Sequence, residues 1–240
     1  MQKAAQDYVN NCAQCQRYAP NIHQPGGVLH LLSNPWPFAQ WDLDIVGLFL
    51  MALGNRRWFL VETDYFIKWV EAEPLSNIRD VDAKKFVWRN IVTRFEIPHT
   101  LILDNGLQFN SKAFRRYCGE LGIRNRYSIP AYPQGNRQAI VVNKVIVSGL
   151  KKRLDEAKGK WMDELPHVLW TYCTTPQRST GETPFSMTYG SEAVIPLEAG
   201  FSTLRTSQFS VEENNHLLST SLDLIGKRRE VVMVKMAHYQ

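Results

Sequence analysis

The stretch from residue 41 to residue 47 reads Trp41-Asp42-Leu43-Asp44-Ile45-Val46-Gly47. Its apolar alternation, ended by a glycine, predicts a β-strand that carries Asp44 on one face. Asp42 lies two residues earlier, so strand periodicity places it on the same face as Asp44. From there it is expected to supply an outer contact at most.

A second apolar run, residues 100–103, ends at Asp104-Asn105-Gly106, a turn signal that places an aspartate at the C-terminal end of a strand. Taken singly, either aspartate could simply cap a turn. Magnesium, however, is commonly bound through oxygen ligands that include one or two carboxylates, with water and substrate phosphate completing its shell. Asp44 and Asp104 on two strands therefore predict a Mg²⁺ or Mn²⁺ site suited to phosphoryl transfer.

A loop containing proline and glycine follows and opens a long helix; it reads Ile129-Pro130-Ala131-Tyr132-Pro133-Gln134-Gly135-Asn136-Arg137-Gln138-Ala139-Ile140-Val141-Val142-Asn143-Lys144. With the two aspartates, this loop resembles the integrase of plant-type gypsy-class long-terminal-repeat retrotransposons, an RNase H-like enzyme. The family's site is two aspartates and a glutamate, with thirty-five residues between the last two. Its loop runs Pro-Gln-Gly-Asn-Gly, and its glutamate comes three residues after the last glycine. In this chain Arg137 stands for that glycine and Ile140 for the glutamate, with thirty-five residues between Asp104 and Ile140.

The resemblance implies in-line displacement at phosphorus with two metal ions about 4 Å apart, the second held by the glutamate. An isoleucine has no oxygen to offer a hard cation. Since losing even an outer-shell partner costs about 10- to 100-fold in metal affinity or activity, we expect metal binding to be weak or lost and strand transfer to be absent. Glu120 is expected to pair with Arg116 on a helix surface rather than to replace the missing ligand.

Other departures from the family's pattern also indicate a degenerate sequence. Glu96 stands where the family has a glycine after a helix, a place that favours left-handed backbone. The remaining departures are Leu103, in place of a small hydroxyl residue, and Leu48 and Leu50, in place of prolines.

Positive charge gathers around the proposed site. The whole chain carries +5 and has a pI near 9.0, and residues 104–160 hold twelve Lys and Arg against four Asp and Glu. This balance predicts an anionic partner, DNA. Helical spacing places Ile140, Asn143, Lys144, Val147 and Lys151 on one face. The predicted nucleic-acid contacts are Asn136, Arg137, Asn143, Lys144 and Lys151, the alternative being an ordinary solvated face.

Cys12 and Cys15 have the spacing of half a zinc site. In the resembling family two upstream histidines complete it, but residues 1–11 contain none, and His23 and His30 do not match the usual finger spacing. We interpret the pair as the remnant of an N-terminal module, residues 1–30, which does not bind zinc. Cys118 and Cys173 are predicted to be buried small residues.

The chain is predicted to be α/β, with an RNase H-like core in which helices flank a mixed five-stranded sheet, and with a C-terminal helical extension. The core is assigned to residues 31–195, and a linker and helix to residues 196–240. Strands are expected near 41–46, 57–65, 69–74, 100–103 and 123–128, and helices near 80–95, 111–121, 136–157 and 161–174. Thr183 and Pro184 predict an N-cap and first helical residue. In the helix predicted for 211–240, one apolar stripe either packs on its own domain or forms a dimer seam: Leu218, Leu222, Ile225, Val232 and Met236.

The leading hypothesis is therefore a retrotransposon integrase core, involved by descent in DNA integration, that binds nucleic acid but is a pseudoenzyme. One alternative is a host-retained nucleic-acid-binding or protein-interaction module. The other is an active polynucleotidyl transferase with a different third ligand. Nuclear localisation follows from the resemblance, and a possible homo-oligomer follows from the apolar stripe of the C-terminal helix. No run of eighteen apolar residues predicts a membrane span.

Overall fold

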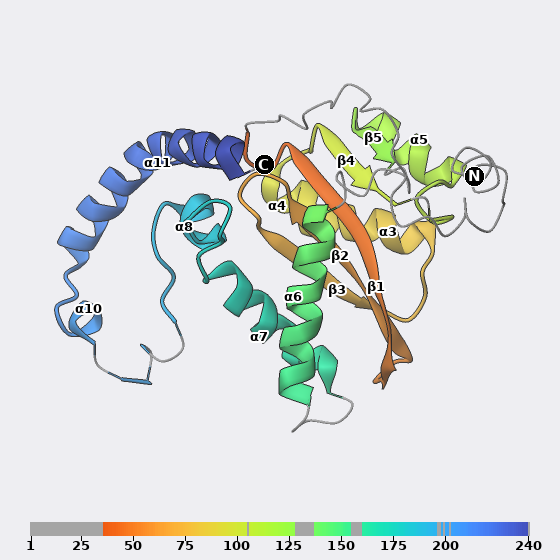
Figure 1. The fold of residues 1–240 in the computed structure, drawn as a ribbon, viewed down its shortest axis with the longest axis horizontal. Helices are drawn as coiled ribbons and strands as arrows, with labels where there is room; N and C mark the ends of the chain where they lie inside the picture. The colour runs from red at the N-terminus through yellow and green to blue at the C-terminus, as the bar shows by residue number, and fades with distance from the viewer. Residues whose placement is uncertain are drawn as a thin grey trace, which may run out of the picture. The chain divides into compact units, whose positions relative to one another are not determined.

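A five-stranded mixed sheet of order β3-β2-β1-β4-β5 forms the centre of the fold in this computed structural model (Figure 1). The structure describes residues 36–104, 106–127, 137–154, 160–195, 198, 200–201 and 203–239. The strands are β1 (Gln40–Ala52), β2 (Arg56–Asp64), β3 (Val70–Leu75), β4 (Thr100–Leu103) and β5 (Arg124–Tyr127). Strands β1, β2 and β3 form an antiparallel meander, and β4 and β5 continue in parallel from β1. The predicted mixed sheet is confirmed.

Helices occupy the predicted positions. The segment predicted over 80–95 is α3 (Asp80–Phe86), a π-helical stretch η1 (Val87–Val92) and α4 (Thr93–Phe95). The remaining helices are α5 (Lys112–Glu120), α6 (Arg137–Leu154), α7 (Trp161–Cys173), α8 (Pro184–Tyr189), α10 (Leu204–Ser207) and α11 (Val211–Tyr239). None of the helices in the described part of the chain combines the length and apolar character that a membrane span requires.

The sheet is covered on both faces. On one face the segment η1–α4 is tied to β3, because Arg94 pairs with Glu71 at 2.6 Å and Asn90 donates to Glu73 at 3.1 Å. On the other face α6 and α7 pack on the strands, and Trp161 Nε1 at the start of α7 donates to the Leu50 carbonyl of β1 at 2.9 Å. Burial of both faces explains why consecutive residues of β1 and β2 are enclosed.

Helix α6 is anchored by a buried stripe of Val142, Ile146 and Leu150, which recurs every four residues. Next to it, Gly149 lies against α7: a Cβ there would stand 2.9 Å from Val168 Cγ1, closer than side-chain contacts allow. The glycine therefore lets α6 and α7 approach closely. This packing fixes the rotation of α6 and so decides which of its residues face β1.

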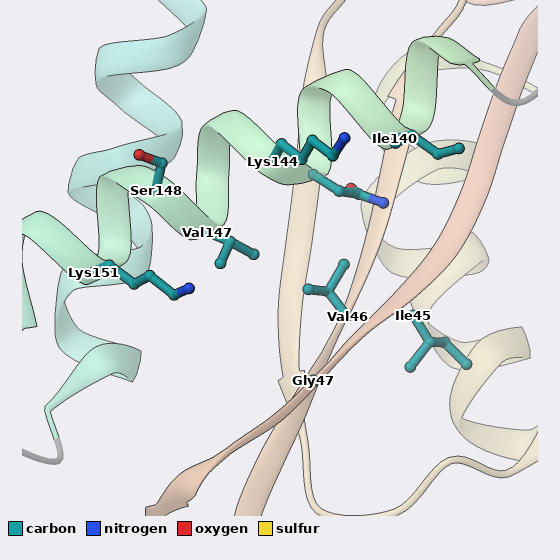
Figure 2. Close-up of a pocket in the computed structure, with 9 residues that line it drawn as sticks. Ile45, Val46, Gly47, Ile140, Lys144, Val147, Ser148 and Lys151 are labelled. Atoms are coloured by element: carbon teal, nitrogen blue, oxygen red, sulfur yellow. The ribbon is translucent and has the colours of Figure 1, made fainter.

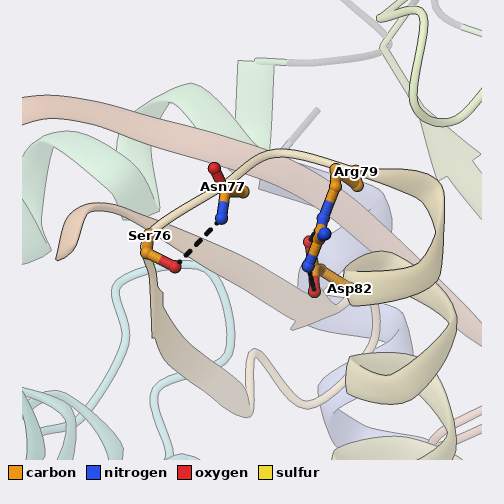
Figure 3. A network of polar contacts seen from close by, with 4 residues as sticks. All are labelled: Ser76, Asn77, Arg79 and Asp82. Atoms are coloured by element: carbon orange, nitrogen blue, oxygen red, sulfur yellow. Dashed lines mark hydrogen bonds and ion pairs between the residues drawn. The ribbon is translucent and has the colours of Figure 1, made fainter. Parts of the chain in front are cut away.

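The β3–α3 connection is held by short polar contacts (Figure 3). Arg79 precedes α3 and pairs with Asp82 in its first turn, with Nε to Oδ2 at 2.8 Å and Nη2 to Oδ1 at 3.2 Å. This hydrogen bonding holds the pKa of Asp82 below its ordinary value. Asn77 Nδ2 donates to Ser76 Oγ at 3.3 Å. An acid in the first turn also complements the positive end of the helix.

Helix α4 ends at Glu96, whose backbone adopts φ 79° and ψ 177°. This region is essentially restricted to glycine and costs other residues about 1–3 kcal/mol. The expectation of unfavourable backbone at this position is confirmed. The Glu96 side chain itself is exposed, so removing it sacrifices no buried contact.

Glu96→Gly is expected to raise the free energy of unfolding by about 1–2 kcal/mol, because glycine adopts this backbone without strain. Urea denaturation measures the change, and Glu96→Ala is the matched control because it removes the carboxylate but keeps the Cβ. If alanine stabilised the protein as much as glycine, charge rather than backbone strain would be the cause.

The C-terminal segment agrees with prediction in part. Thr183 caps α8, its Oγ1 accepting from the Ser186 N–H at 2.9 Å, with Pro184 as first residue. The predicted linker 196–210 contains the unpredicted helix α10. The C-terminal half of α11 is tied to α8 by Arg229, which donates to the Met187 carbonyl at 2.9 Å, and its Val232 is buried in the hydrophobic core. The C-terminal part of the predicted stripe therefore packs on its own domain.

Candidate active site

The sheet brings Asp44 and Asp104 side by side. Strands β1 and β4 are parallel, with Leu43 opposite Leu103. The residue that follows each of these two leucines is one of the two aspartates. Burial raises the pKa of Asp44, and repulsion from Asp104 adds to this effect. The predicted convergence of the two carboxylates is the geometry observed.

Each aspartate is held in place by hydrogen bonds. The Ile45 N–H donates to Asp44 Oδ1 at 2.7 Å, and Asn143 Nδ2 of α6 donates to Asp44 Oδ2 at 2.6 Å. The Gly106 N–H donates to Asp104 Oδ1 at 2.9 Å. Asn143, predicted only as a nucleic-acid contact, is thus engaged with Asp44. No local sequence signal could predict this bond, because the two residues are 99 positions apart and meet only when α6 docks on β1.

Ile140 lies on α6 one turn before Asn143, and its side chain is 40% exposed. Both residues line an open groove of about 490 Å³ between α6 and β1 (Figure 2). Its lining residues are Ile45, Val46, Gly47, Ile140, Asn143, Lys144, Val147, Ser148 and Lys151. The helix face predicted from the spacing of residues 140–151 is confirmed, since all five of its residues line this groove.

The groove combines an apolar wall with cationic side chains. Val46 and Val147 provide apolar surface, and Lys144 and Lys151 extend from α6 (Figure 2). Both lysines are exposed. An exposed ammonium group can approach a phosphate without the cost of leaving water completely.

Two further acids are buried in the sheet close to the aspartates. Asp42, on the same strand face as Asp44 as predicted, is 3% exposed, and its Oδ2 has no hydrogen-bond partner. Burial raises its pKa well above the ordinary range, with repulsion from Asp44 and Asp104 adding to the effect. Glu62 is fully buried, and neither of its carboxylate oxygens has a partner. Burial raises its pKa most, followed by repulsion from Asp42 and Glu71.

The side chains present do not fit a centre with three carboxylate ligands. In the described part of the chain, no group of three or more His, Cys, Asp or Glu side chains is placed to hold a metal ion. Ile140 has no ligating atom. Glu120, as predicted, is a surface residue paired with Arg116 at 3.7 Å.

Several predicted residues receive no test from the structure. Cys12, Cys15 and Asn136 lie outside the described residues, and Arg137 starts α6 but its side chain is not among those described.

Cys118 and Cys173 are buried, as predicted. Burial raises the pKa of the Cys118 thiol to about 11 and that of Cys173 to about 12, which disfavours the reactive thiolate.

Comparison with known proteins identifies the core. Residues 35–133 match the family model described as "Integrase core domain". The chain is 30% identical over 202 residues to the Gag-Pol polyprotein of gibbon ape leukemia virus, and 28% identical over 189 residues to that of avian reticuloendotheliosis virus. It is 24% identical over 215 residues to the transposon Tf2-3 polyprotein of Schizosaccharomyces pombe. These alignments cover 83%, 78% and 88% of this chain but only 12%, 16% and 16% of the polyproteins.

Solved structures agree on the fold. A chain of the simian T-cell lymphotropic virus intasome, in complex with a PP2A regulatory subunit, aligns with a TM-score of 0.61 at 21% identity, covering 82% of this chain and 69% of that one. The HTLV-2 integrase catalytic core domain in complex with magnesium, in a trimeric form, aligns with a TM-score of 0.52 at 18% identity, covering 62% of this chain and 95% of that one. The fold is thus that of integrase catalytic cores, which are RNase H-like. By sequence, residues 35–133 match the integrase core domain model, and the chain is similar to parts of retroviral and Tf2 transposon polyproteins.

Proposed function

We propose that the chain is the integrase core of a plant-type, gypsy-class long-terminal-repeat retrotransposon, which keeps the fold and a DNA-binding groove but has lost strand-transfer activity. One observation carries this proposal: Ile140 lines the groove one helical turn from Asn143, which is bonded to Asp44. That is the place at which the resemblance expects the metal-binding glutamate. Residues 1–30 are taken as an N-terminal remnant, 31–195 as the core and 196–240 as linker and helix, in a protein that acts in the nucleus.

The chemistry of the lost activity depends on charge at this position. Asp44 and Asp104 would hold a first Mg²⁺ or Mn²⁺ ion, which would supply one of the two positive charges that stabilise the attacking and leaving oxygens in a two-metal site. A second ion needs oxygen donors that a branched alkyl group cannot provide. Asp42 does not replace them, because it is buried in the sheet rather than exposed to the groove.

Strand transfer on a labelled DNA duplex in the presence of Mg²⁺ or Mn²⁺ is the test of inactivity. The proposal expects no joined product from the unmodified chain. In the same assay, joined product would support the alternative of an active polynucleotidyl transferase with a different third ligand, and its absence would count against that alternative.

DNA contact is proposed to persist at the groove, because Lys144 and Lys151 present two exposed positive charges seven residues apart on one helix face. Each phosphate that a lysine neutralises contributes about 0.9 to the slope of log K against log salt concentration. The affinity for duplex DNA is therefore expected to rise as the salt concentration falls.

The double variant Lys144→Gln/Lys151→Gln is expected to reduce that slope by about 1.8, with fluorescence anisotropy on a labelled duplex as the measurement. Lys85→Gln is the matched control, since Lys85 is exposed on α3 away from the groove residues. Equal slopes for the double variant and the control would remove Lys144 and Lys151 from the interface.

A protein-interaction role is the second candidate function. The observation that favours it is the number of large apolar side chains that α11 leaves exposed, among them Leu217, Leu224 and Val231. Such patches commonly mark interaction surfaces.

A further inference from the structure

Helix α11 carries a second apolar stripe, separate from the one that packs on α8. Leu217, Leu224 and Val231 are spaced by seven residues and are 57%, 41% and 55% exposed. Seven residues are almost two turns, so the three side chains share one side of the helix. Val232, which packs against the domain, lies about 100° away from Val231 around the helix axis. The stripe therefore has no covering element in the described part of the chain.

The charges at the two ends of this stripe are opposite and symmetric. Glu213 lies eleven residues before Leu224, and Lys235 lies eleven residues after it. Eleven residues are close to three full turns, so both residues project from the side of Leu224, and the Lys235 ammonium group lies beside Gly181 of the same chain. Both residues are exposed, and neither forms an ion pair within the residues the structure describes.

We propose that α11 binds α11 of a second copy of this chain as an antiparallel pair, with the two-fold axis at Leu224. In that arrangement Leu217 of one copy meets Val231 of the other, and Glu213 meets Lys235, at both ends of the pair. A parallel pair in register would instead set Glu213 against Glu213 and Lys235 against Lys235. The antiparallel arrangement also opposes the two helix dipoles.

The size of the surface sets the strength of association. Stable protein interfaces bury about 1,600 Å² in total, and one helix pair with three apolar residues per copy provides less. Association is therefore expected to be weaker than in a stable dimer and to depend on concentration. The surface lies outside residues 35–133, the part matched to the integrase core, so its test is independent of the proposed DNA-binding and catalytic properties.

Disulfide cross-linking of the full chain tests the geometry, in a background in which Cys12 and Cys15 are replaced by serine. Leu224→Cys is expected to form a disulfide-linked dimer under mild oxidation. Leu217→Cys alone is expected not to, because the antiparallel pair separates its two copies by about 21 Å along the axis. An equal mixture of Leu217→Cys and Val231→Cys chains is expected to cross-link.

The control for random collision is Met233→Cys, because Met233 is 41% exposed on the opposite side of α11. Cross-linking of Leu224→Cys no faster than this control overturns the proposal. Self-cross-linking of Leu217→Cys also overturns it, in favour of a parallel pair.

Sedimentation over a concentration series tests the charges. Leu224→Glu is expected to raise the Kd at least about tenfold, and Lys235→Glu to weaken association as well. Adding Glu213→Lys to Lys235→Glu is expected to restore it. All three positions are exposed, and circular dichroism checks that each variant is folded. Association unchanged in every variant places the contact on another surface and contradicts the proposal.

Discussion

Replacing Ile140 with glutamate is expected to raise the affinity of the chain for Mn²⁺ by at least about 10- to 100-fold, since even outer-shell partners of a metal contribute that much. The new carboxylate would lie on the groove face of α6, one turn from Asn143, at a position already 40% exposed. It needs no repacking of the core. Beside Asp44 and Asp104 it completes a set of three carboxylates.

Thermal unfolding with and without Mn²⁺ measures this gain, because a ligand that binds only the folded state stabilises it by RT ln(1 + [L]/Kd). Without metal, repulsion among three carboxylates is expected to make the Ile140→Glu protein less stable than the original chain. Ile140→Gln is the matched control, of similar size but without charge. Equal Mn²⁺ shifts for the glutamine and glutamate variants would show that charge at residue 140 does not govern metal binding.

Glu62→Met is expected to raise the free energy of unfolding at pH 7 by about 2 kcal/mol or more, because a buried polar group without a hydrogen bond costs about that much. Glu62 is fully buried and both of its carboxylate oxygens lack partners. Methionine is unbranched and fills a similar space.

The effect is expected to depend on pH. Burial raises the pKa of Glu62 in the folded protein above that of the unfolded chain. The folded protein is therefore more stable when the Glu62 carboxyl is protonated. This stability is fully present below the unfolded pKa, about 4.3, and is lost as pH rises towards the folded pKa. Glu62→Gln should reduce the fall in stability above pH 4.3 by at most about 1.4 kcal/mol per pH unit, the effect of one proton. A residual slope from Asp42 is expected, because its pKa is raised as well.

Glu71→Gln is the control for this pair of variants. Glu71 lies opposite Glu62 on β3, but its carboxylate accepts from Trp69 Nε1 at 2.7 Å and pairs with Arg94 at 2.6 Å. Removing its charge is expected to destabilise the protein. If urea denaturation showed Glu62→Met to be destabilising too, then Glu62 would have favourable interactions in solution.

Much of the core could be predicted from local sequence. All five strands were predicted, β1 and β4 from apolar patterns, whereas β5 is the polar segment Arg124–Tyr127. The spacing of residues 140–151 identified the groove face of α6. The Thr183-Pro184 pair predicted the start of α8, since N-capping and a fixed proline φ are local effects. Strand β1 extends past its predicted end to Ala52, because the β1–β2 hairpin pairs Ala52 with Arg56.

The remaining features depend on tertiary structure. The bond between Asn143 and Asp44 requires α6 to dock on β1, and the burial of Glu62 requires helices to cover its face of the sheet. Helix α10 has only four residues, too few for a periodic pattern to be recognised. The division of α11 into a packed and an exposed stripe was also beyond prediction, because it depends on where α8 lies.

We propose that the chain keeps the fold of an integrase core without a working two-metal centre. The most direct measurement is strand transfer of a labelled duplex in Mn²⁺ by the unmodified protein, with Ile140→Glu in parallel. The account predicts no joined product from the unmodified chain at any Mn²⁺ concentration. Efficient joining by the chain that carries Ile140 would contradict it.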